Sequence, residues 1–198
     1  MLLSACNGMF SGIYDDVTES SESEYGFVTP ATQNSAGTIY INASEYTEWT
    51  YINFDERTAT TLSVDEQAPA DWDIAIHRYD AKTNGGAVAE SSAQDFSSVQ
   101  SASTGAFSSD VWTTSKIVVD MSTMMDGYLG YVESYYNETL SGWLNVDTSS
   151  MPPTYTPSNK IYVVRMRDGS KAAVRLANFM DASGTKGYMT IEYLYPLN

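Results

Sequence analysis

The sequence predicts a mostly-β protein with one all-β domain built from β-hairpins, preceded by a disordered N-terminal tether. Three observations lead to this fold class. The 198 residues include 15 Tyr and 4 Trp, and aromatic enrichment favours half-buried pleated surfaces. From about residue 37, short alternating apolar stretches are separated by turn signals, as in hairpin proteins. Helical periodicity is scarce, and its best candidate is residues 126–140.

Residues 1–36 form the predicted tether, and residues 37–198 form the predicted domain. The tether is rich in Ser, Gly and Thr, and residues 7–36 carry five acidic side chains without a Lys or Arg. Such a composition buries too little apolar surface to fold by itself. We therefore interpret it as a flexible spacer, within which a short apolar cluster at residues 25–28 is able to dock on the domain.

The only cysteine, Cys6, is the predicted site of lipidation. Residues 3–6 read Leu-Ser-Ala-Cys, the pattern of a bacterial lipobox, and the tether follows directly. Residues 1–3 are interpreted as the remnant of a signal peptide. The chain contains no apolar run of 18 residues, so we expect contact with the membrane only through the lipid. The expected location is the surface of the outer membrane, or the extracellular space after release.

Within the domain, the clearest element is a predicted β-hairpin. Residues 161–166 and 171–176 alternate in polarity and flank an Asp-Gly turn at 168–169, which is a strong hairpin signal. The Ser- and Ala-rich segment 89–110 has weak periodicity and no assigned role. Further strands are predicted at residues 37–42, 49–54, 73–79, 116–120 and 187–195.

Charge and residue counts exclude several functions. The net charge of −15 repels phosphate backbones and anionic membranes, so nucleic acid is not an expected partner. With one His and one Cys, the chain offers no Cys–His pair and no His/Cys zinc site. His77 lies within a strand pattern and is interpreted as structural. Because no catalytic motif occurs, we expect a binding protein and not an enzyme.

Methionine is the unusual residue type. Met121, Met124 and Met125 follow a predicted strand, and Met151 lies in a loop rich in Ser and Pro. Thioether sulfurs are soft ligands that suit haem iron or Cu(I). Methionine also fills irregular apolar gaps, so composition alone leaves packing open as the other interpretation.

Aromatic residues surround these methionines in the sequence. Tyr128, Tyr131 and Trp143 are the candidates for lining a ligand cleft, since rings pack against flat apolar ligands. Ordinary sheet aromatics would give the same pattern, and clefts that bind sugars use such rings as well. A surface glycan-binding or adhesion module therefore remains the alternative function.

At this point the chain resembles a known family, the HmuY family of haem-binding lipoproteins. The most specific stretch is residues 71–80, which read Asp-Trp-Asp-Ile-Ala-Ile-His-Arg-Tyr-Asp. The resemblance extends over about residues 37–198. Further matching stretches are residues 49–54, Gly142-Trp143-Leu144, Pro153-Thr154-Tyr155, residues 160–165 and residues 190–196.

The resemblance implies a single mostly-β domain that holds haem between two loop or hairpin fingers. It also implies a haemophore-like lipoprotein that captures haem, with host haemoproteins as a source, and passes it to a TonB-dependent outer-membrane receptor. Its role would be iron acquisition.

The sequence departs from the member of this family that uses two axial histidines. Those positions align roughly with Tyr128 and Thr148, and His77 matches a histidine that is not a ligand. Other members, which this chain resembles more closely, use two methionines. On this resemblance we expect Met124 and Met151 to hold the iron, with Met125 as the substitute for Met124. Met166, Met180 and Met189 lie in or near strand patterns and are expected to pack.

Overall fold

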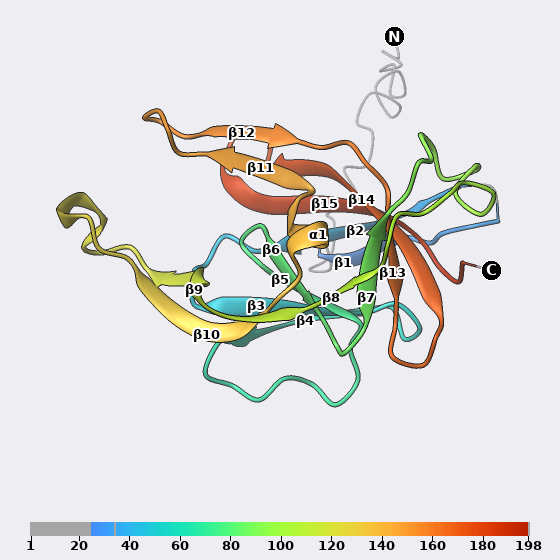
Figure 1. Ribbon diagram of the computed structural model, residues 1–198, viewed down its shortest axis with the longest axis horizontal. Coiled ribbons are helices and arrows are strands. Elements are labelled where there is room, and N and C mark those ends of the chain that lie inside the picture. Colours follow the sequence, from blue (N-terminus) through green and yellow to red (C-terminus); the bar gives the residue numbers. More distant parts are fainter. Residues whose placement is uncertain (1–24, 34, 198) are drawn as a thin grey trace, which may run out of the picture.

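The computed structural model describes residues 25–33 and 35–197, and almost all of their regular structure is β-strand (Figure 1). Two sheets form the body of the domain, and two separate hairpins project from it to the same side. The predicted fold class, a mostly-β single domain, is confirmed. Cys6 and residues 1–24 of the predicted tether lie outside the described residues.

The larger sheet has seven strands in the order β1-β2-β15-β14-β13-β7-β8. Every pairing within it is antiparallel, and β13 and β14 form the hairpin predicted around the Asp-Gly turn. Its strands are β1 (Gly26–Thr29), β2 (Gly37–Asn42), β7 (Ala87–Glu90), β8 (Ser108–Ser109), β13 (Tyr162–Arg165), β14 (Lys171–Met180) and β15 (Lys186–Leu194).

The smaller sheet has four strands in the order β4-β3-β5-β6, again all antiparallel. Strand β5 is buried at all four positions, which explains its continuous Ile-Ala-Ile-His sequence. The strands are β3 (Glu48–Asn53), β4 (Thr58–Ser63), β5 (Ile74–His77) and β6 (Asp80–Thr83).

The two projecting hairpins are the fingers of this fold. The first finger, residues 111–136, pairs β9 (Val111–Asp120) with β10 (Gly130–Tyr136) and carries a 3-10 turn, η1 (Met124–Asp126), between the strands. The second finger, residues 144–157, pairs β11 (Leu144–Asp147) with β12 (Thr154–Pro157). A single helical turn, α1 (Glu138–Ser141), connects them (Figure 1).

Two expectations from the sequence are corrected. The helix predicted at 126–140 is wrong, because residues 130–136 form β10 through pairing with β9, and only α1 beyond them is helical. Asn137 caps that turn by accepting a hydrogen bond from Leu140 N at 2.9 Å. The boundary at residue 36 also falls too late, because β1 pairs with β2 and brings residues 26–29 into the domain.

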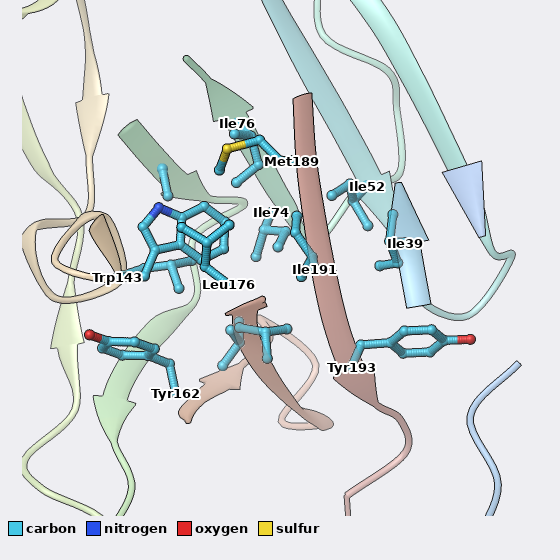
Figure 2. Close-up of a cluster of buried hydrophobic side chains, with 14 of the residues drawn as sticks. Ile39, Ile52, Ile74, Ile76, Trp143, Tyr162, Leu176, Met189, Ile191 and Tyr193 are labelled. Atoms are coloured by element: carbon cyan, nitrogen blue, oxygen red, sulfur yellow. The ribbon is translucent and has the colours of Figure 1, made fainter. Parts of the chain in front are cut away.

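The main core lies between the two sheets and is closed by Trp143 and Leu140 at the base of the fingers. Alternate residues of β15, such as Met189, Ile191 and Tyr193, face this core, as expected for a strand that is buried on one side. Figure 2 shows Trp143, Met189 and Tyr193 among the buried side chains. Met166 and Met180 also pack here, which confirms their predicted structural role.

The segment 89–110 covers the outer face of the seven-stranded sheet. Ala93, Phe96 and Val99 are buried there against residues of β13, β14 and β15, in a second hydrophobic cluster. Its weak periodicity follows from this role, since a covering loop contributes single anchors and not a continuous stripe. Among the described residues, no helix is long and apolar enough to cross a membrane.

Candidate functional site

A groove of about 940 Å³ lies between the two fingers, within the size range of about 300–1,000 Å³ that is typical of ligand sites. The turn between β5 and β6, one side of α1 and Tyr46 in the loop before β3 also contribute to its lining. The apolar side chains that line it come from the fingers and lie far apart in sequence: Val118, Met121, Met124 and Leu129 from the first, and Leu144, Val146, Met151 and Pro153 from the second.

The structure brings two predicted ligand residues together and leaves the third outside. Met124 and Met151 both line the groove, one from each finger, and their side chains are 39% and 76% exposed. Met125 is 88% exposed and does not line it. Met121, which directly follows β9 and was not among the expected ligands, lines the groove as well, and its backbone oxygen accepts a hydrogen bond from Met124 N.

The predicted aromatic lining residues are not the ones that the structure places in the groove. Tyr128 and Tyr131 are 73% and 43% exposed and lie outside the lining. Four other tyrosines line it instead: Tyr46, Tyr79, Tyr136 and Tyr155. Tyr46 and Tyr79 lie far from the methionines in sequence, so proximity along the chain gave no signal for them.

Trp143 is also a correction, because it is fully buried in the core and cannot contact a ligand in the groove. Its indole Nε1 donates a hydrogen bond to the backbone oxygen of Tyr79 at 2.8 Å. The neighbouring residues Gly142 and Leu144 do line the groove. Trp143 therefore stabilises the groove indirectly, because its hydrogen bond fixes the β5–β6 turn against the start of the second finger.

Arg78 is the central residue of the charged part of the groove. It adopts a left-handed backbone conformation, with φ of 54°, in the turn between β5 and β6. Its guanidinium carbon lies 4.4 Å from the ring centre of Tyr46 and 5.2 Å from that of Tyr79. The group donates hydrogen bonds to the backbone oxygen of Ser44 and the hydroxyl of Tyr79. Two aromatic faces thus hold a positive charge at the groove.

His77 is a structural residue, as the sequence predicted. It is buried, and its Nε2 lies 2.7 Å from the backbone oxygen of Tyr46, so this nitrogen carries the proton and donates a hydrogen bond to the carbonyl. Burial lowers the pKa of His77 to about 4, despite the opposing effect of that hydrogen bond. The imidazole is therefore neutral at physiological pH and links β5 to the loop before β3.

Asp80 and Lys116 meet in the same part of the groove. Burial raises the pKa of Asp80 to about 7, while the positive charge of Lys116 acts in the opposite direction. The Lys116 ammonium lies 5.8 Å from the ring centre of Tyr136. Near neutral pH the groove thus holds two positive charges beside a carboxyl that is partly protonated.

The Asp80→Asn substitution is expected to change the free energy of unfolding differently at the two pH values. The difference between variant and wild type should be about 2 kcal/mol more favourable to the variant at pH 8 than at pH 5. The raised pKa means that the folded protein keeps a proton that the unfolded chain loses, and the stability from this proton is lost as pH rises through about 7. The opposite contribution of His77, lost as pH falls towards about 4, is present in both proteins and cancels. Urea unfolding at both pH values measures the effect, and an equal difference at pH 5 and pH 8 would contradict it.

The structure is an all-β domain with an open groove between two hairpins, and comparisons with known proteins supply its family. The family model described as HmuY protein matches residues 45–193. A solved structure from Bacteroides vulgatus, described as a candidate HmuY-like haem-binding protein, is 53% identical with a TM-score of 0.82. The alignment covers 88% of this chain and 100% of that one. The chain therefore belongs to the HmuY family.

Two further solved structures are similar. A candidate lipoprotein from Bacteroides fragilis is 47% identical with a TM-score of 0.84, covering 90% of this chain and 98% of that one. The apo HmuY analogue of Tannerella forsythia is 24% identical with a TM-score of 0.69, covering 80% and 94%, and shares the fold. No curated protein matches the chain. Because the HmuY family is not enzymatic, the prediction of a protein without catalytic activity is confirmed.

Proposed function

We propose that this protein captures haem for iron acquisition and holds the iron through the thioethers of Met124 and Met151. One observation carries the proposal: these two methionines reach the same groove from separate fingers. Exposed methionines on opposite walls are poorly explained by core packing, because neither side chain is buried. The similarity to the Bacteroides vulgatus protein, described as a candidate haem binder, supports the ligand class.

The lining of the groove fits haem. Apolar side chains from both fingers and four tyrosines would contact the porphyrin, and burial of such surfaces supplies much of the affinity for a flat apolar ligand. Thioether sulfur is a soft, neutral ligand, and axial methionine raises the potential of haem iron. His77 is not positioned as a ligand, because its Nε2 is hydrogen-bonded to the backbone oxygen of Tyr46 and its Nδ1 is buried.

Titration of the purified protein with haemin, before and after dithionite, tests the proposal. We expect one haem per chain, a sharp low-spin ferrous spectrum, and weaker binding of the oxidised form, because thioether ligation favours Fe(II). Absence of a spectral change in both redox states would overturn haem binding.

The alternative, a glycan-binding or adhesion module, has one observation in its favour. Trp112 and Tyr135 form an exposed T-shaped pair on the first finger, with ring centres 5.1 Å apart, and do not line the groove. An oligosaccharide panel titrated in parallel with haemin discriminates the two functions. Binding of a sugar without binding of haemin would favour the alternative.

We further propose that Cys6 is lipidated, that the protein is displayed on the outer membrane or released from it, and that it passes haem to a TonB-dependent receptor. The lipobox pattern at residues 3–6 and the similarity to the candidate lipoprotein of Bacteroides fragilis support the anchor. In cells that lipidate such proteins, the Cys6→Ala variant is expected to move from the membrane fraction to the soluble fraction. Unchanged fractionation would argue against lipidation.

A further inference from the structure

We propose that Arg78 and Lys116 bind the two propionate carboxylates of the haem, so that the groove selects porphyrins that carry free acids. This inference rests on the proposed function and adds to it the charged edge of the ligand. Both cations line the same groove as Met124 and Met151, but they come from different elements, the β5–β6 turn and the middle of β9.

Arg78 has unused capacity to bind an anion. Among residues 25–33 and 35–197, the ion pairs are Lys160 with Glu90 and Arg175 with Glu192, so the guanidinium has no carboxylate partner. Its hydrogen bonds go to the oxygens of Ser44 and Tyr79, and its Nε is buried with no hydrogen-bond partner. An arginine presents five N–H donors in a planar fork that matches a carboxylate. With one donor of each terminal nitrogen used and Nε buried, one N–H on each terminal nitrogen remains for a carboxylate.

Lys116 supplies the second positive charge. Its side chain is exposed and lines the groove at the edge of the first finger. Two acids, Asp80 and Glu138, share this part of the groove, and burial keeps Asp80 partly protonated near neutral pH. The local balance is therefore positive or neutral in a protein whose net charge is −15. The overall negative charge of the protein repels an anionic ligand. A local pair of cations in the groove offsets this repulsion.

The arrangement of the lining matches the shape of haem. The ends of the fingers provide the methionines, Leu129 and Pro153, whereas the β5–β6 turn provides Arg78 and the middle of β9 provides Lys116. Haem has the same asymmetry, since one edge of an apolar macrocycle carries both propionates. A porphyrin held at its iron by the finger methionines would therefore direct its acidic edge towards Arg78 and Lys116.

The test compares haemin with haemin dimethyl ester, whose propionates are neutral, on the wild type and on Arg78→Gln, Lys116→Gln and the double variant. The wild type is expected to bind haemin at least about tenfold more tightly than the ester, because each charge-assisted hydrogen bond contributes that much. The double variant is expected to bind both ligands equally, and each single variant to lie between. Lys160→Gln removes the same charge at a residue that does not line the groove and should keep the full preference.

The outcomes separate this inference from the proposed function. A full preference for haemin in the double variant, or no preference in the wild type, would overturn the propionate assignment while haem binding stands. Failure of the wild type to bind either ligand would overturn both. Thermal unfolding would detect a variant Arg78→Gln that destabilises the β5–β6 turn. Because Lys116 is exposed, Lys116→Gln should not affect the fold and keeps the test valid in that case. Partial recovery of the preference in Arg78→Lys would support the role of the charge.

Discussion

Replacing Met124 and Met151 together by Ala is expected to abolish the low-spin ferrous spectrum of the haemin-loaded protein. Both thioethers would be lost, and no other groove residue offers a neutral soft donor except Met121. Each single substitution should leave one axial position to a weaker ligand and convert the ferrous iron to a high-spin form. Absorbance spectra after dithionite, together with the dissociation constant, measure both effects.

Met125→Ala is the matched control, because it removes the same side chain at the adjacent position outside the groove. Its spectrum should equal that of the wild type. An unchanged spectrum in the Met124/Met151 double variant would contradict the ligand assignment. Loss of the spectrum in Met121→Ala, with a normal spectrum in Met124→Ala, would transfer the axial position to Met121.

Trp143→Ala is expected to reduce the free energy of unfolding by about 3–5 kcal/mol, as is usual for removal of a large buried aromatic side chain. The indole is fully buried in the main core, and its removal leaves a cavity beneath the groove. It also leaves the backbone oxygen of Tyr79 without its donor. Because this bond fixes the turn that carries Arg78, haemin affinity should fall as well.

Urea unfolding of the purified variant measures the loss of stability. Trp112→Ala is the matched control, since this tryptophan is exposed on the first finger and its removal should change stability by less than about 1 kcal/mol. Trp143→Phe keeps most of the packing but not the hydrogen bond and should lie between the two. A loss below about 1 kcal/mol in Trp143→Ala would contradict the supporting role assigned to this residue.

Local patterns were enough to predict β2, β3, β5, β13, β14 and β15 of the two main sheets, but not the other strands of those sheets. Alternation identified β2, β3 and β15 within a residue or two, and the Asp-Gly turn identified the β13–β14 hairpin, because both signals depend only on neighbours along the chain. The helix predicted at 126–140 failed for the same reason, since the pairing of β10 with β9 is not encoded in residues 130–136 alone. The two strands of each short finger gain their structure by pairing with each other.

The sequence by itself determined the mostly-β class, the absence of a catalytic motif, and methionine as the candidate donor type. Only the tertiary structure decided which side chains meet: Met124 lines the groove while Met125 lies outside it, and Trp143 is buried while Tyr46 and Tyr79 take the lining positions. Adjacent residues in a turn have the same sequence signal, yet only one of the two lines the groove. Groove residues from distant segments come together only through sheet pairing, which depends on contacts across the whole chain.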